Sequence, residues 1–183
     1  NVKEGGLSFG TSCEMTAEIT RRLRPLTEKT IIIKLTPNVA HISEFARAAA
    51  AAGADAVSVI NTLIGMAVDA DKREPKLSTV TGGLSGPAIK PVALAKVFEA
   101  ARAVRIPVIG IGGIMSAEDA VEFLLVGAAA VQVGTANFID PAAGMKIVAD
   151  LEQYCIRRGI KNVADLVGGL KASKELSVVH SWL

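Results

Sequence analysis

Four short apolar segments divide the chain, at residues 31–35, 56–60, 108–111 and 129–133. They do not alternate apolar with polar residues, which is typical of strands that are covered on both faces. Between and beside them, apolar residues recur at the spacing of a helix. This spacing predicts helices at residues 15–26, 42–52, 91–104 and 145–158, and another between Ser116 and Gly127. Strands that alternate with helices imply right-handed βαβ units on a parallel sheet.

Residues with strong local preferences mark the ends of these helices. Gly53 and Gly127 close two of them, because glycine readily adopts the left-handed conformation that follows a helix. Ser116 is a good N-terminal cap, and Glu118 and Asp119 behind it favour the positive end of the helix dipole.

One connection departs from this alternation. Residues 62–90 are long for a strand-to-helix loop and dense in glycine, serine and charge, and long connections of this kind are usually functional or disordered. No internal repeat or domain boundary is evident. We therefore expect one domain over residues 1–183, with a loosely ordered tail at 172–183 in which Trp182 can dock.

The number of units limits the fold. Four βα units are too few to close a barrel, which needs eight and about 250 residues. The chain is therefore either a small open sheet or the C-terminal half of a (β/α)8 TIM barrel, an α/β fold in both cases. It begins at Asn1 rather than at Met, which favours missing sequence and hence the half barrel.

Composition indicates a location and excludes several partners. The 183 residues are half hydrophobic and carry a net charge of +2, so neither nucleic acid nor a membrane surface is an expected partner. No apolar stretch approaches the roughly 20 residues that cross a bilayer, and the polar first residues are not a signal peptide. Cys13 and Cys155 lack metal-ligand spacing and suit reduced thiols. We expect a cytoplasmic protein without a metal.

Two glycine turns follow the last two predicted strands. Gly112 and Gly113 come directly after one strand, and Gly134 and Thr135 after the next. Glycine lets the backbone approach an anion closely, and the N–H groups that open the next helix point at it with the helix dipole behind them. Two tight turns that merely suit glycine are the alternative, but two in this order favour the phosphate site of barrels. The spacing is not that of a dinucleotide fingerprint.

Polar residues end the first two strands. Lys34 closes an isoleucine run where barrel sites lie, so we favour a ligand contact over a lysine that reaches to solvent. Asn61 and Thr62 end the second strand, and they can bind a small polar ring or a carboxylate, although a turn or capping role is equally compatible. Asn38 suits a turn or cap better than a ligand.

The remaining candidate residues give weaker evidence for a functional site. Residues 81–86 form a glycine- and serine-rich loop whose N–H groups can line a ligand. His41 and His180 have no partners that suggest a metal or a triad, and Cys13 suits a structural thiol. No acid/base pair is evident. A phosphate-bearing cofactor would explain this, because the cofactor then carries the chemistry.

Several motifs together carry a resemblance to a known family. They are Asn-Val-Lys-Glu-Gly-Gly at 1–6, Phe-Gly at 9–10, Lys-Leu-Thr-Pro-Asn at 34–38, Ile-Asn-Thr-Leu at 60–63, the string from Thr81 to Pro91, Gly112-Gly113, and Val-Gly-Thr-Ala at 133–136. The chain thereby resembles the dihydroorotate dehydrogenases, in the class that works with an electron-transfer subunit and NAD. The match extends to about Leu170, and the string at 81–91 is its most specific part.

The resemblance implies a fold, a cofactor and a reaction. The fold would be a (β/α)8 barrel that holds FMN and oxidises dihydroorotate to orotate in pyrimidine synthesis. Lys34 would contact the flavin ring, and the backbone at Ile60 and Gly86 would line it. The phosphate would be held by residues already singled out, namely Gly112, Gly113, Gly134 and Thr135. Asn61 and Thr62 would bind the substrate. The resemblance therefore favours a ligand role for these two residues over a turn or capping role.

The resemblance also implies partners and an incomplete site. An electron-transfer subunit with FAD and an iron–sulfur cluster is the expected partner, and exposed sheet edges would favour a homo-oligomer. The family's catalytic base is a cysteine in a stretch like Asn-x-Ser-Cys-Pro-Asn, whose last residue matches Asn1, so Cys13 is not that base. We therefore expect the chain alone to be inactive. Two alternatives are a flavin domain like that of dihydropyrimidine dehydrogenase and a non-catalytic half barrel that binds phosphate.

Overall fold

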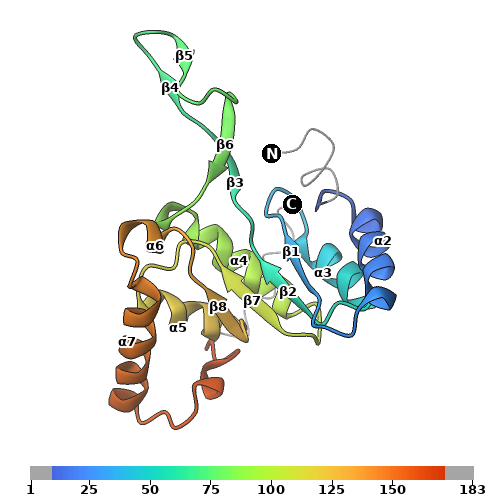
Figure 1. Ribbon diagram of the computed structural model, residues 1–183. Coiled ribbons are helices and arrows are strands. Elements are labelled where there is room, and N and C mark those ends of the chain that lie inside the picture. The colour runs from blue at the N-terminus through green and yellow to red at the C-terminus, as the bar shows by residue number, and fades with distance from the viewer. Residues whose placement is uncertain (1–9, 172–183) are drawn as a thin grey trace.

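Four parallel strands form the centre of the molecule. The computed structural model describes residues 10–171, and its main sheet has the order β1-β2-β7-β8 (Figure 1). The strands are β1 (Ile32–Leu35), β2 (Ala56–Val59), β7 (Val108–Ile111) and β8 (Ala130–Gln132). Each lies within one residue of its predicted bounds, because short buried apolar runs are a strong strand signal. The α/β class and the parallel sheet are confirmed.

Helices follow the strands as predicted. They are α2 (Cys13–Leu23), α3 (Ile42–Ala51), α4 (Lys90–Ala101), α5 (Ala117–Leu125), the short α6 (Ala136–Ile139) and α7 (Ala143–Arg158). Three single turns accompany them, at Arg24–Leu26, Pro87–Ile89 and Val163–Leu166. The first helix begins earlier than expected because Ser12 caps it through a hydrogen bond from the Met15 amide. None of the helices within residues 10–171 is both long and apolar enough to cross a membrane.

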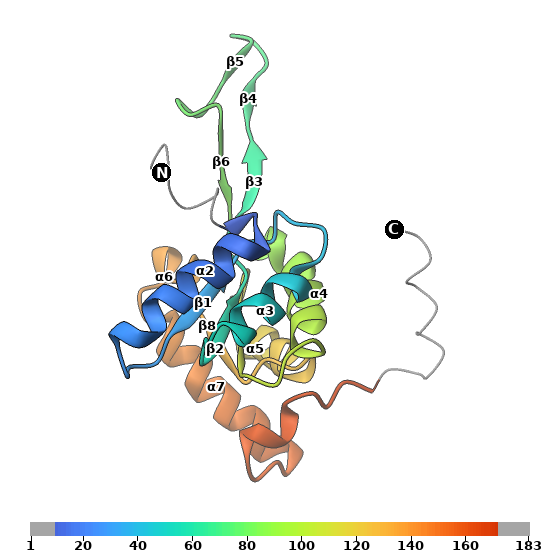
Figure 2. The ribbon, with the colours of Figure 1, turned by 90° about the vertical axis from the view of Figure 1, so that its right-hand side faces the viewer.

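The hydrophobic core lies between the sheet and the helices on one of its faces. Figure 2 shows α2, α3 and α4 on that side. Val57, Val97 and Phe123 are fully buried there. The Phe123 ring packs directly over Gly110 of β7, where a side chain on the strand would collide with it. This close packing brings α5 directly against β7.

The opposite face of the sheet is open, which corrects the expectation of strands covered on both faces. Only β2 is buried at every residue. On the open face Ile32 is 45% exposed, and Lys34 and Gln132 are also exposed. The apolar runs were therefore a reliable sign of strands but not of two covering layers.

The long connection between β2 and α4 is an arm rather than an irregular loop. Its stem pairs β3 (Leu63–Met66) antiparallel with β6 (Thr81–Leu84), and its outer part pairs β4 (Val68–Asp69) with β5 (Glu74–Pro75). Both views show this arm projecting away from the sheet (Figures 1 and 2). The predicted loop at 81–86 is thus mostly a strand, and only Ser85 and Gly86 lie in a loop. The predicted tail at 172–183, with Trp182 and His180, lies outside the described residues.

Candidate functional site

Three loops meet beyond the carboxyl ends of the sheet. Thr135, after β8, has its hydroxyl 2.9 Å from the Ser85 hydroxyl at the foot of the arm. A Cβ placed on Gly113 would lie 2.8 Å from the Gly86 carbonyl oxygen, so the loop after β7 touches the same place. The structure therefore brings together Gly86, Gly113 and Thr135, which the sequence predicted as cofactor-binding residues from separate parts of the chain.

Glycine is required in the loop after β7. Gly112 and Gly113 have φ values of +140° and +78°, which residues with a side chain rarely adopt. A Cβ on Gly112 would also lie 2.8 Å from the Ala93 Cβ of α4. Gly134 differs, because no atom lies within 4 Å of the place where its Cβ would be. The backbone is closely packed on one side of the site and open beside Gly134.

Unused backbone donors border this open space. Within residues 10–171, no hydrogen bond engages the amide N–H groups of Gly113, Ile114, Gly134 or Thr135. Buried or half-buried N–H groups are normally paired, and Ile114 is only 3% exposed. Glycine loops with free N–H groups are typical of sites that bind phosphate oxygens. The arrangement therefore fits an anion with several oxygen acceptors.

The N-terminus of α5, which the sequence predicted to face the anion, already holds a carboxylate of its own. Ser116 caps the helix as predicted, but Asp119 reaches back and accepts hydrogen bonds from the Met115 and Ser116 amides at 2.8 and 3.0 Å. This capping box already places a carboxylate at the positive end of the helix. The amides that precede it, at Gly113 and Ile114, have no partner within residues 10–171.

Lys90 joins Asp119 from the start of α4. Its ammonium lies 2.6 Å from the Asp119 carboxylate and 2.9 Å from that of Glu122. Hydrogen bonds to both carboxylates raise the pKa of Lys90. Burial opposes ionisation of Asp119, but the hydrogen bonds from Lys90, Met115 and Ser116 outweigh it, so the pKa of Asp119 is lowered. Both groups are therefore charged at neutral pH.

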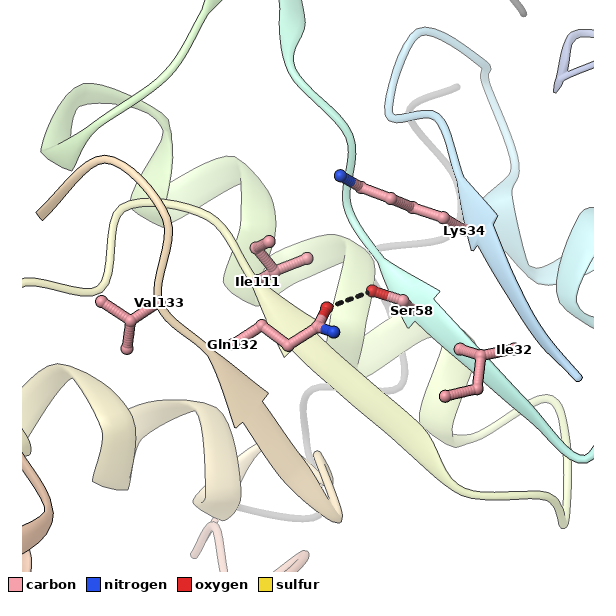
Figure 3. Close-up of a pocket in the computed structure, with 6 residues that line it drawn as sticks. All are labelled: Ile32, Lys34, Ser58, Ile111, Gln132 and Val133. Carbon is pink, nitrogen blue, oxygen red and sulfur yellow. Dashed lines mark hydrogen bonds between the residues drawn. The ribbon is translucent and has the colours of Figure 1, made fainter. Parts of the chain in front are cut away.

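A second polar cluster lies on the open face of the sheet. Lys34 extends from β1 over a hollow of about 560 Å³ (Figure 3). In the same hollow the Ser58 hydroxyl donates a 2.7 Å hydrogen bond to the Gln132 side-chain oxygen. Sequence reasoning found Lys34 but missed Ser58 and Gln132, although each is a polar residue within an apolar strand. The hollow thus combines a cation and an amide above apolar residues, which suits a ring with polar edges.

The end of β2 combines backbone and side-chain roles. The Ile60 amide donates to the Ile111 carbonyl at 2.9 Å, and the Asn61 amide to the Leu35 carbonyl at 2.8 Å. Asn38 bonds the Thr62 carbonyl and the Ile64 amide, each at 3.0 Å, so it joins the loop after β1 to the start of the arm, a contact between distant residues that the predicted turn or cap role did not include. The Asn61 side chain makes no hydrogen bond within residues 10–171, which leaves it available to a ligand.

The other titratable residues within 10–171 show no metal site. No group of three or more His, Cys, Asp or Glu residues in the described part of the chain could hold a metal. Cys13 packs against the core on the helix side of the sheet. Burial and the nearby Glu44 carboxylate raise the pKa of its thiol, which lowers the fraction of thiolate that could act as a base at neutral pH.

Comparisons with known proteins show the family to which the chain is similar. A family model for dihydroorotate dehydrogenase matches residues 1–155. Similar curated proteins are the dihydroorotate dehydrogenase B (NAD(+)) catalytic subunits of Trichlorobacter lovleyi and Phocaeicola vulgatus, 58% and 56% identical over 171 residues. That of Geobacter metallireducens is 57% identical over the same length. In each case the match covers 93% of this chain and 56% of the relative, so the chain spans about half the length of the curated relatives it matches.

Proposed function

The chain belongs to the dihydroorotate dehydrogenase family, and we propose that it forms the FMN phosphate-binding half of an enzyme that oxidises dihydroorotate to orotate in pyrimidine synthesis. One observation carries the proposal: glycine loops far apart in the sequence meet at the carboxyl ends of β7 and β8, and their amide groups have no partner within residues 10–171.

The architecture supports a half barrel. The strands β1, β2, β7 and β8 are all parallel, and the helices cover one face. In a closed barrel the other face is the interior, which is filled by side chains from all eight strands. The exposed Ile32 on that face fits a surface that further strands would cover. The glycine loops lie at the ends of the strands where barrels place their sites.

FMN fits the residues that are present. Gly112 and Gly113 have no room for side chains, Gly134 lies beside open space, and the amides of Gly113, Ile114, Gly134 and Thr135 can hold the phosphate. Lys34 would contact the flavin ring, and the backbone of Ile60 and Gly86 would line it. The chemistry that FMN supplies when bound is the acceptance of a hydride from dihydroorotate.

Asn61 and Thr62 would bind the substrate. They directly follow β2, between Lys34 on one side and the foot of the arm on the other. The free amide of Asn61 can donate to a carboxylate and accept from a ring N–H, as recognition of orotate requires. Binding of the substrate carboxylate next to Lys34 would orient its ring over the flavin.

We expect the chain alone not to turn over dihydroorotate. Proton removal needs a base within reach of the substrate. The chain has no stretch like Asn-x-Ser-Cys-Pro-Asn around either cysteine, and the raised thiol pKa of Cys13 does not suit the role. Measurable oxidation of dihydroorotate by the purified chain would contradict this expectation.

Two kinds of partner are proposed. The relatives are named catalytic subunits, which supports a second subunit, and we propose that it carries FAD and an iron–sulfur cluster to accept electrons. We also propose a homo-oligomer, because in residues 10–171 the outer edges of β1 and β8 are unpaired and the sheet face is open. A molar mass equal to that of one chain, measured by light scattering at micromolar concentration, would contradict the proposed homo-oligomer.

A comparison of FMN with riboflavin tests the proposal. The two ligands share the ring system and differ in the phosphate. We expect quenching of flavin fluorescence on titration with the full chain, with FMN bound at least about tenfold more tightly, as charge-assisted hydrogen bonds to a phosphate imply. No binding of FMN, or equal affinity for the two, would contradict it. Orotate should then perturb the absorbance of bound FMN, whereas uracil would do so in a dihydropyrimidine dehydrogenase-like domain.

A further inference from the structure

We infer that the Lys90–Asp119 ion pair positions the phosphate-binding loop, with both residues acting through the backbone of Gly113 and Ile114 rather than as ligands. This inference rests on the proposed function. It concerns the start of α4 and the first turn of α5, whose side chains meet behind the loop that connects β7 to α5.

The carboxylate of Asp119 gathers three groups. It accepts hydrogen bonds from the Lys90 ammonium at 2.6 Å and from the Met115 and Ser116 amides at 2.8 and 3.0 Å. These two amides directly follow Gly113 and Ile114 in the chain. Their bonds to Asp119 therefore fix the direction in which the chain leaves the glycine turn.

Lys90 holds the same turn from the other side. A Cβ on Gly113 would lie 2.9 Å from both the backbone nitrogen and the Cβ of Lys90. Lys90 also follows Gly86 through the turn at Pro87–Ile89, so its ion pair ties the foot of the arm to the loop after β7. Two of the three loops at the site are thereby joined.

Burial and charge indicate a structural role for the pair. The Lys90 and Asp119 side chains are only 25% and 15% exposed, unlike the solvated surface pairs that contribute little. The Lys90 charge is balanced by Asp119 and Glu122, both within 3 Å. A lysine engaged by two carboxylates is not available as a cation for the phosphate.

Three variants of the full chain test the inference. The readout is the affinity of FMN divided by that of riboflavin, measured by fluorescence titration. Asp119→Ala and Lys90→Met should each lower this ratio about tenfold, because mispositioned amides lose hydrogen bonds to a charged group. Riboflavin affinity should fall less than FMN affinity, since Lys34 is not touched and only the backbone at Gly86 is shared with the ring site. Lys90→Arg keeps the ion pair and should restore most of the ratio.

A matched control lies at the other end of the sheet. Asp55 accepts bonds from the Arg24 guanidinium at 2.8 Å and the Ile31 amide at 2.7 Å, which is likewise a basic side chain together with a backbone amide. Asp55→Ala should lower the melting temperature but leave the ratio unchanged. Equal ratios in the wild type, Asp119→Ala and Lys90→Met would overturn the inference. A ratio that rises in Asp119→Ala would also overturn it, because Lys90, once freed, would then be a direct ligand.

The outcomes separate this inference from the proposed function. If the wild-type chain binds FMN no better than riboflavin, the proposed phosphate site fails first, and the inference fails with it. If the wild type discriminates and the variants still do so, only the inference fails. Should Asp119→Ala not fold, the comparison of Lys90→Met with Lys90→Arg decides the question alone.

Discussion

Glycines with positive φ occur at both ends of the central sheet. Their amide N–H groups are hydrogen-bonded at one end and have no partner within residues 10–171 at the other. At the amino ends of the strands, Gly53 and Gly127 end helices, and their amides donate to Ala50 and Leu124 carbonyls at 3.1 and 2.9 Å. At the carboxyl ends, the Gly113 amide has no partner within residues 10–171. Positive φ alone therefore does not distinguish a structural turn from the proposed binding loop. The two kinds of turn differ in whether the amide of the glycine itself is hydrogen-bonded.

Alanine substitutions at Gly113 and Gly127 should have the largest effect on stability. Because the two glycines lie at opposite ends of the central sheet, the pair also tests whether only one end binds the ligand. A Cβ would lie 2.8 Å from the Gly86 carbonyl at the first site and 2.7 Å from the Ala101 Cβ at the second. Left-handed strain of about 1–2 kcal/mol and overpacking of about 1–3 kcal/mol predict a loss of about 2–5 kcal/mol for each. Urea unfolding measures this loss.

Ligand binding then distinguishes these two variants. At a temperature where both remain folded, Gly113→Ala should bind FMN at least about tenfold more weakly, because at least one hydrogen bond to the phosphate is lost. Gly127→Ala should bind it as the wild type does. Equal losses of FMN affinity in two folded variants would mean that the ends of the sheet do not differ in the proposed way.

Asp55 and Asp119 should both make the free energy of unfolding depend on pH in acid, but to different extents. The pKa of Asp55 is lowered by the Ile31 amide and Arg24, and that of Asp119 by hydrogen bonds that outweigh its burial. A lowered folded pKa contributes stability that is present above the unfolded value of about 3.9 and is lost as pH falls through the folded value. Stability should therefore fall below about pH 4 through both groups.

Asp119 should dominate this acid dependence. Its side chain is 15% exposed, compared with 46% for Asp55. Asp119→Ala should lower the free energy of unfolding at pH 7 by about 1–3 kcal/mol, as loss of a charge-assisted hydrogen bond implies, and should flatten its dependence on acid. Asp55→Ala should cause a smaller loss at pH 7 and a smaller change in the acid dependence. Urea unfolding of both variants at pH 7 and pH 3 measures these two effects. A larger effect of Asp55→Ala than of Asp119→Ala would contradict the prediction.

Local signals in the sequence predicted most of the sheet and half of the site. The strands follow from buried apolar runs, and the glycine pairs at 112–113 and 134–135 from their position after strands. Ser116 and Asp119 were also recognised at the start of α5, but not that together they form a capping box that places a carboxylate there.

Contacts between distant residues were not predictable in this way. Lys90 pairs with Asp119 across 29 residues, and Ser58 with Gln132 across 74. The arm was mistaken for a loop because its strand at 81–84 contains glycines and depends on pairing with β3 rather than on its own propensity. These contacts and the pairing of β3 with β6 depend on how distant parts of the chain pack together. That packing cannot be read from the local pattern of a single sequence.

The smallest expected effect on stability belongs to Gly134→Ala, and it tests the site most directly. Gly134 has no positive φ and no atom within 4 Å of the added Cβ, so the free energy of unfolding should change by less than about 0.5 kcal/mol. The methyl group would instead enter the open space beside the free amides of Gly134 and Thr135, and it should weaken FMN but not riboflavin. Gly144→Ala is the matched control, because its Cβ also meets no atom. It lies within α7 and should stabilise the helix by about 0.5–1 kcal/mol with no effect on either flavin. If both variants bind FMN as the wild type does, the space beside Gly134 does not hold the phosphate, and the free amides at this end of the sheet need another explanation.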